Sequence, residues 1–217
     1  MMNLIRNLSV DTRKIEVNAS LRRLLVLFLL LSYLLMKSEV TIHDKTFVPF
    51  IGADKIQARV AELGAVIDND YANKRPLLVG VLNGSAIFMA DLLRHIHTAC
   101  EIAFIRVSSY HGTESTGSVK QVLGLNEDLT GRDVILVEDI IDSGHTIDHV
   151  LKLLQTRNPA SLKVCALLDK PTRRETYVPI GYLGFEIPNE FVFGYGLDLD
   201  EYFRNLRFVG VVKKEYQ

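Results

Sequence analysis

Two adjacent carboxylates at the end of an apolar run are the residues of this sequence best placed to do chemistry. Residues 134–137 are apolar, as in a buried strand, and Glu138 and Asp139 follow them directly. Open α/β sheets bind their ligands at the carboxyl ends of the strands, so these side chains are expected at such a site. Neighbouring carboxylates suit the hydroxyl groups of a ligand or a hard cation rather than a phosphate.

The small residues that follow predict a site for a phosphate group. Ser143, Gly144 and Thr146 form a turn that leads into a helix predicted over residues 146–155. Backbone N–H groups at a helix N-terminus bind anions, and a glycine lets the backbone approach them closely. Taken alone, the carboxylates suit an exposed strand end, and Asp142 or Ser143 suits a helix cap. The order of strand, acidic pair, small turn and helix favours the binding site.

Strand and helix patterns alternate around this segment. The predicted helices cover residues 53–71, 86–97 and 146–155, and the predicted strands cover residues 77–82, 100–107, 134–137 and 162–168. This alternation predicts an α/β fold with a central, mostly parallel sheet and helices on both faces. The polar residues 108–118, with Gly112 and Gly117, predict a mobile loop. The C-terminal residues predict short strands and loops that form a cap.

Composition limits the class of protein. A chain of 217 residues suits one domain with a substantial core. The formal net charge of −1 gives no broad attraction to nucleic acid, so an anionic ligand needs a local site. Cys100 and Cys165 lie far apart in apolar runs and form no CxxC pair, which indicates reduced thiols in a cytoplasmic protein.

The N-terminal residues differ from the rest of the chain. An apolar run over residues 24–35 follows Arg22 and Arg23. It is shorter than the roughly 20 residues that span a bilayer, and no small-residue cleavage site follows it. We expect residues 1–35 to be an extension and residues 36–217 to be the domain, with Met36 as the natural start. A signal peptide and a membrane-associating tail are the alternatives.

The segment VEDIIDSGHT, residues 137–146, resembles the phosphoribosyl-pyrophosphate motif of the type I phosphoribosyltransferases, in particular the hypoxanthine-guanine branch. The resemblance covers about Thr41 to Tyr216 and implies the type I fold, with a small hood built from both ends of the domain. It implies that Glu138 and Asp139 contact the ribose hydroxyls and that Asp142 is the general base near the purine. It also implies a 5′-phosphate site made of Asp142, Ser143, Gly144, His145 and Thr146.

Other stretches resemble the pyrophosphate side of the same family. Residues 82–85, Leu-Asn-Gly-Ser, resemble its pyrophosphate loop, although many members carry lysine where this chain has Asn83. Ser109 and Tyr110 open the loop that closes over the reacting ribose in the family. The resemblance implies a pyrophosphate site made of Asn83, Gly84, Ser109, Tyr110 and Arg204.

The last matching stretches concern the purine and the cofactor. The resemblance implies that Lys170, Phe191, Val192 and Asp198 bind the purine, and that Glu138, Asp139 and Asp198 contact Mg²⁺. The implied reaction is purine salvage, in which phosphoribosyl pyrophosphate and hypoxanthine or guanine give IMP or GMP plus pyrophosphate. A cytoplasmic homodimer or homotetramer is implied, with no nucleic acid and no membrane as partner.

Three alternatives stay open at this point. A regulator of the same fold would sense phosphoribosyl pyrophosphate and bind RNA or DNA. The near-neutral net charge and the complete set of expected purine-binding residues argue against this alternative. An enzyme of the same fold would act on xanthine, adenine or orotate. A membrane-tethered scaffold would use the apolar run at residues 24–35.

Overall fold

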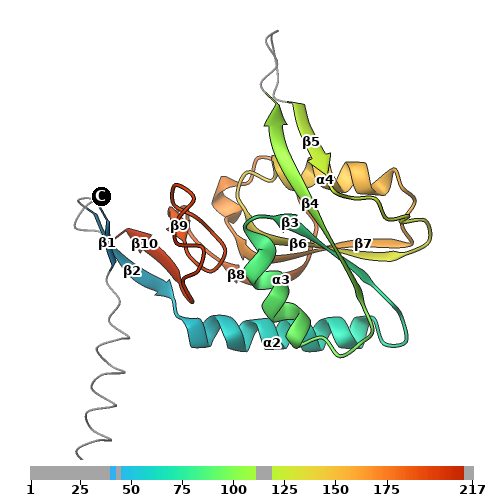
Figure 1. Cartoon of the computed structure of the whole chain (residues 1–217), viewed down its shortest axis with the longest axis horizontal. Coiled ribbons are helices and arrows are strands. Elements are labelled where there is room, and N and C mark those ends of the chain that lie inside the picture. The colour runs from blue at the N-terminus through green and yellow to red at the C-terminus, as the bar shows by residue number, and fades with distance from the viewer. Residues whose placement is uncertain (1–39, 43–44, 111–118, 213–217) are drawn as a thin grey trace, which may run out of the picture. The chain divides into compact units, whose positions relative to one another are not determined.

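The computed structural model describes residues 40–42, 45–110 and 119–212 (Figure 1). The expected extension over residues 1–35, Met36, and Gly112 and Gly117 of the expected loop lie outside the described residues. Of Ser109 and Tyr110, the backbone is described but the side chains are not. Within the described part, no helix is both long and apolar enough to span a membrane.

The described residues form a six-stranded sheet in the order β5-β4-β3-β6-β7-β8. Its strands are β3 (Leu77–Leu82), β4 (Glu101–Tyr110), β5 (Val119–Leu123), β6 (Asp133–Ile141), β7 (Ser161–Asp169) and β8 (Ile180–Glu186). All neighbouring strands pair in parallel except β5, which is antiparallel to β4. The predicted mostly parallel sheet is therefore confirmed, and the carboxyl ends of β3, β6 and β7 share one edge.

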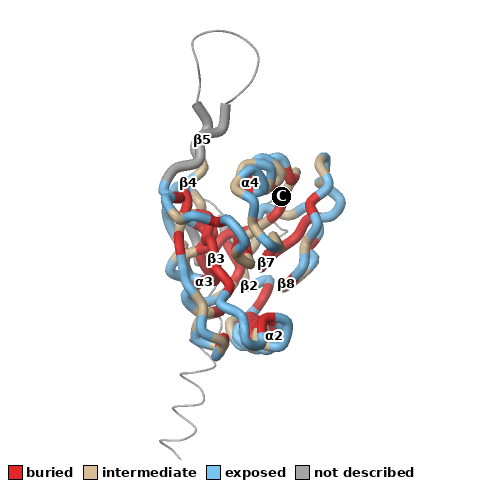
Figure 2. The backbone as a smooth tube through the Cα atoms, turned by 90° about the vertical axis from the view of Figure 1, so that its right-hand side faces the viewer, coloured by how far each residue is buried: buried red, intermediate tan, exposed pale blue. Residues whose placement is uncertain are grey.

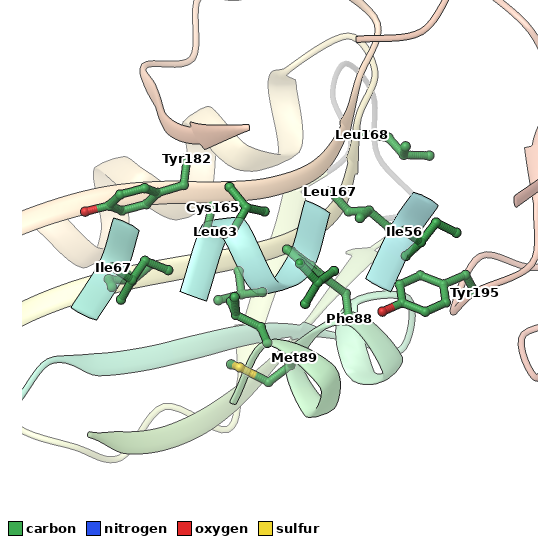
Figure 3. Close-up of a cluster of buried hydrophobic side chains, with 14 of the residues drawn as sticks. Ile56, Leu63, Ile67, Phe88, Met89, Cys165, Leu167, Leu168, Tyr182 and Tyr195 are labelled. Atoms are coloured by element: carbon green, nitrogen blue, oxygen red, sulfur yellow. The ribbon is translucent and has the colours of Figure 1, made fainter. Parts of the chain in front are cut away.

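Helices cover both faces of this sheet, as predicted. Helices α2 (Ala53–Asp70) and α3 (Ser85–Arg94) pack with one core cluster, and α4 (His145–Gln155) packs with the other. Figure 2 shows the buried residues along β3 and β7, between α2 and α4. Figure 3 shows how α2 places Ile56, Leu63 and Ile67 toward the sheet, at the spacing of one helix face.

A second, four-stranded sheet in the order β1-β2-β10-β9 joins the two ends of the described chain. Its strands are β1 (Val40–Ile42), β2 (Lys45–Ile51), β9 (Val192–Phe193) and β10 (Val209–Val212), and all neighbours pair antiparallel. Val192 of β9 pairs with β10, which in turn pairs with β2. The predicted hood from both chain ends is thus a single small sheet.

Some element boundaries, and the place of one strand, differ from the sequence-based expectation. Helix α3 ends at Arg94 rather than at residue 97, and β4 runs on to Tyr110 because it pairs with β5 inside the expected loop. Strand β6 continues to Ile141 rather than ending at residue 137, because its pairing with β7 extends to Asp169. The prediction that all residues after β7 form a cap was wrong for β8, which extends the main sheet beside β7. A short 3₁₀ helix, η1 (Pro171–Arg173), follows β7.

Candidate active site

The turn between β6 and α4 has the backbone geometry expected of a phosphate cradle. Gly144 has a φ of 90°, a left-handed conformation that favours glycine, and its carbonyl accepts the first helical N–H, from Asp148, at 2.9 Å. The N–H groups of Glu175 and Thr176 donate to the Ser143 carbonyl at 2.9 and 3.1 Å, which fixes the turn from outside. A side-chain carbon at position 144 would overlap the Thr176 carbonyl, so the chain requires glycine there.

A pocket of about 120 Å³ opens over this turn. It is lined by Glu138, Ile140, Ile141, Asp142, Ser143, Gly144, Thr146 and Ile147. The pocket joins the end of a strand to the start of a helix, where backbone N–H groups have no partner within the helix. It therefore has the size and the donors for an anionic group, with the carboxylates of Glu138 and Asp142 at its side.

The two adjacent carboxylates lie on opposite faces of β6, since side chains alternate along a strand. Glu138 is buried and lines the pocket, whereas Asp139 lies against Gly84. Burial raises the pKa of Asp139 to about 6, although hydrogen bonds to backbone N–H groups and the charge of Arg204 oppose the change. The negative charge of Asp198 in the C-terminal loop adds a smaller increase to this pKa.

Asp142 lies next to two cations at the mouth of the cradle. Lys170 Nζ is 3.5 Å from Asp142 Oδ2, and Arg173 Nε is 2.9 Å from Asp142 Oδ1. The Lys170 side chain is buried, and its backbone N–H donates to the Ile141 carbonyl at 3.0 Å. The structure thus brings together the expected base and the expected purine-binding lysine. Arg173 was missed, because no motif marks an exposed arginine of a short helix.

The turn of Asn83 and Gly84, between β3 and α3, faces the other side of the acidic pair. The peptide bond between Leu82 and Asn83 is cis. Arg106 Nη2 donates to Asn83 Oδ1 at 2.9 Å. A guanidinium therefore lies beside this loop, where many family members carry a lysine in place of Asn83. Sequence reasoning missed Arg106, because only the pairing of β3 with β4 sets it beside Leu82.

The C-terminal loop carries the remaining expected residues. Arg204 Nη2 is 2.8 Å from Asp198 Oδ1, and Arg204 Nη1 donates to the Gly196 carbonyl at 2.8 Å. The N–H of Glu201 donates to Asp198 Oδ2 at 2.9 Å. Arg204 and Asp198, both expected in the site, therefore form an ion pair with each other.

Phe191 and His145 have different surroundings from the other expected residues. Phe191 is 56% exposed, which leaves its ring available for stacking on a planar ligand, whereas Val192 beside it is buried in β9. His145 hydrogen-bonds through Nε2 to Glu175 and through Nδ1 to Thr176, both at 2.8 Å. Its side chain does not line the pocket, so a phosphate contact of His145 stays a prediction.

The expected Mg²⁺ ligands agree with magnesium chemistry in their donor type. Among the residues described, no group of three or more His, Cys, Asp or Glu side chains could hold a metal ion by itself. Mg²⁺ needs no such group, since one or two carboxylates and the phosphates of a substrate commonly bind it. Asp139 is half-buried, and the charge of Asp198 influences its carboxylate, which fits this type of site.

Comparisons with known proteins agree with this geometry. The family model of the phosphoribosyl transferase domain matches residues 52–200. The hypoxanthine-guanine phosphoribosyltransferase of Streptococcus agalactiae is 49% identical over 163 residues, which cover 75% of this chain and 91% of that protein. That of Bacillus subtilis is 45% identical over 172 residues, which cover 79% and 95%.

A longer relative and a solved structure complete the comparison. The bifunctional protein TilS/HprT of Listeria monocytogenes is 44% identical over 176 residues, and the match spans only 27% of its length. A crystal structure of a hypoxanthine phosphoribosyltransferase from Staphylococcus aureus has a TM-score of 0.70 at 43% identity and covers 77% of this chain and 92% of its own. The fold is that of the type I phosphoribosyltransferases. By sequence, fold and cradle together, the chain belongs to the phosphoribosyltransferase family, in its hypoxanthine-guanine branch.

Proposed function

We propose that the chain transfers the 5-phosphoribosyl group of phosphoribosyl pyrophosphate to hypoxanthine or guanine, giving IMP or GMP and pyrophosphate. The observation that carries the proposal is the position of Asp142, which opens the turn of the expected phosphate cradle and at the same time contacts Lys170. A phosphate held in the cradle would thus place its ribose between Glu138 and a base-binding corner made of Asp142 and Lys170.

The residues have separate tasks in the proposed reaction. The cradle of Ser143, Gly144 and Thr146 holds the 5′-phosphate, and Glu138 and Asp139 orient the ribose. As the bond to pyrophosphate breaks, the purine nitrogen bonds to the anomeric carbon from the other face. Asp142 accepts the proton that the purine loses, a contribution typically about 10²–10⁴-fold.

The leaving pyrophosphate requires positive charge. Arg204 and Arg106, together with the N–H groups of the turn at Gly84, would supply it from the protein. Bound Mg²⁺ would neutralise the remaining charge, with Asp139 and Asp198 as protein ligands, whereas Glu138, the third expected ligand, lies on the opposite face of β6. Each carboxylate oxygen of Asp198 takes one contact in the structure, and a carboxylate offers about four acceptor positions, so it can still bind a cation.

Lys170 explains the choice of base. Its ammonium group only donates hydrogen bonds, so it pairs with a 6-oxo group and not with the 6-amino group of adenine. It is 6% exposed, and a buried donor left without a partner is costly. A site built around such a contact rejects the mismatched analogue by up to about 10⁴–10⁵-fold.

A panel of bases assayed for pyrophosphate release tests the proposal. Guanine and hypoxanthine are expected to have the highest kcat/KM, xanthine to be well behind, and adenine to be near background. Adenine turnover within about tenfold of hypoxanthine would contradict the role of Lys170. No release with any purine in the presence of Mg²⁺ and phosphoribosyl pyrophosphate would remove the proposed activity altogether.

The proposal includes a homodimer or homotetramer in the cytoplasm. Sedimentation equilibrium of the purified chain would measure the oligomeric state, and a monomer at micromolar concentration would contradict this part.

A further inference from the structure

A buried tyrosine occupies the tip of the turn that faces the pyrophosphate loop. Residues 194 and 197 exchange backbone hydrogen bonds at 2.9 and 3.2 Å, and the two residues between them have positive φ, 50° for Tyr195 and 102° for Gly196. Positive φ at both central positions is the pattern of a type I′ turn, which favours glycine and asparagine. A tyrosine there costs backbone energy, so its side chain must stabilise the turn in another way.

The Tyr195 side chain anchors this turn on two helices. It is 2% exposed, and its hydroxyl donates to Asp91 Oδ2 of α3 at 2.8 Å. Gln57 of α2 donates to the same carboxylate oxygen at 2.6 Å, so the acceptor is held from both sides. Figure 3 shows Tyr195 at one end of the core cluster, near Ile56 of α2 and Phe88 of α3. Burial and then the bond to Asp91 raise the pKa of Tyr195, as expected for a hydroxyl that stays a donor.

The anchored turn has direct contact with the pyrophosphate loop. A side-chain carbon at Gly196 would overlap the Gly84 carbonyl, so the two backbones lie against each other. Gly196 also exchanges two hydrogen bonds with Arg204, from its own N–H to the Arg204 carbonyl at 2.9 Å and from Arg204 Nη1 to its carbonyl at 2.8 Å. The same helix α3 that carries Asp91 begins immediately after Gly84. One side-chain hydrogen bond thus spans the two segments that would hold pyrophosphate.

We infer that Tyr195 is a positioning residue for the pyrophosphate side of the site: its bond to Asp91 sets the distance between the turn at Gly196 and the loop at Gly84. This inference rests on the proposed function for its substrate. Tyr195 touches none of the expected purine-binding residues through its hydroxyl, so its loss affects pyrophosphate binding and leaves binding of the purine nearly unchanged.

The chain offers a matched control. Tyr182 of β8 is 4% exposed, and its hydroxyl donates to Asp70 Oδ2 of α2 at 2.7 Å. Tyr182→Phe and Tyr195→Phe therefore remove the same type of bond from the same core cluster, but only Tyr195 belongs to the turn against Gly84. A purely structural role predicts the same consequences for both variants.

The experiment measures the Kd of Mg²⁺-pyrophosphate by calorimetry, the KM of phosphoribosyl pyrophosphate and of hypoxanthine, and Tm, for the full chain. Tyr195→Phe is expected to raise the Kd and the KM of phosphoribosyl pyrophosphate by about five- to tenfold, and the KM of hypoxanthine by less than about twofold. Tyr182→Phe is expected to lower Tm by about as much as Tyr195→Phe, but to leave the Kd of Mg²⁺-pyrophosphate and the KM of phosphoribosyl pyrophosphate unchanged. Asp91→Ala should reproduce the defect, and Asp91→Asn, which keeps an acceptor for the hydroxyl, should restore binding.

Several outcomes would overturn the inference. A Kd for Tyr195→Phe within about twofold of wild type, an equal increase for Tyr182→Phe, or equal increases in both KM values would each do so. Wild-type chain without phosphoribosyl transfer would refute the proposed function, while the pyrophosphate Kd values would still decide the role of Tyr195. Wild-type chain that binds no pyrophosphate would refute both.

Discussion

The Cα of Gly84 lies directly against the carboxylate of Asp139, so that a side-chain carbon at position 84 would overlap Asp139 Oδ2. Gly84 ends the loop after β3, and Asp139 belongs to β6, the neighbouring strand. The contact therefore ties the turn at Gly84, the expected pyrophosphate loop, to the acidic pair. The φ of Gly84 is −62°, which any residue adopts, so only the missing side chain explains the glycine.

Gly84→Ala is expected to displace either the loop or the Asp139 carboxylate and to lower kcat/KM by about 10²-fold, since small misplacements of this kind are that costly. Steady-state kinetics would measure kcat/KM for wild type and Gly84→Ala. Gly52→Ala is the control, because Gly52 has a φ of −68° and no atom within 4 Å of an added carbon. Equal activity of both variants would show that the loop adapts without loss.

Asp142→Asn is expected to lower kcat by about 10²-fold or more, with binding of phosphoribosyl pyrophosphate kept within a few-fold. Asparagine keeps the shape and an acceptor for Lys170 and Arg173 but cannot take up the proton. Single-turnover kinetics would isolate the chemical step. Asp148→Asn, which removes a carboxylate paired with Lys152 on α4, should leave that step unchanged. An unaltered chemical step in Asp142→Asn would exclude Asp142 as the base.

Asp68→Asn is expected to destabilise the fold in a pH-dependent way. Burial would raise the pKa of Asp68, but hydrogen bonds from the backbone N–H groups of Thr98 and His97 outweigh it and lower the pKa to about 2. The unfolded value is about 3.9, so this stabilisation is complete above about pH 4 and is lost as the pH falls toward 2. Because these hydrogen bonds go to a charged group, Asp68→Asn is expected to lower the free energy of unfolding by about 1–3 kcal/mol at pH 7.

Urea unfolding of wild type and Asp68→Asn between pH 7 and pH 2 would measure this difference. Asp54→Asn, which changes an exposed carboxylate of the same helix, is the control. The difference in the free energy of unfolding between wild type and Asp68→Asn should narrow only below about pH 4. A gap that stays constant over the whole range would refute the titration of Asp68 as its cause.

Deletion of residues 1–35 is expected to leave folding and kcat/KM unchanged, because every residue of the candidate site lies after Val40. Tm and the base panel, compared between the full and the shortened chain, would test it. A shortened chain that does not fold, or that loses activity, would place these residues within the domain.

Several features of this protein follow from the sequence by itself, because local chemistry decides them. The spacing of Ile56, Leu63 and Ile67 fixes the buried face of α2, and the apolar run at β3 has the predicted bounds. The turn at Gly144 and the start of α4 after it follow from the small turn residues. The family followed from the same segment.

Other features were decided only by the tertiary structure, because they depend on which strands become neighbours. Pairing of β6 with β7 brings Lys170 to Asp142, and pairing of β3 with β4 brings Arg106 to Asn83. Strand β8 belongs to the main sheet because it pairs with β7. No local sequence pattern reveals that pairing, so the sequence did not predict it. The bond between Tyr195 and Asp91 joins residues 104 positions apart, so only packing of the C-terminal turn on α3 creates it.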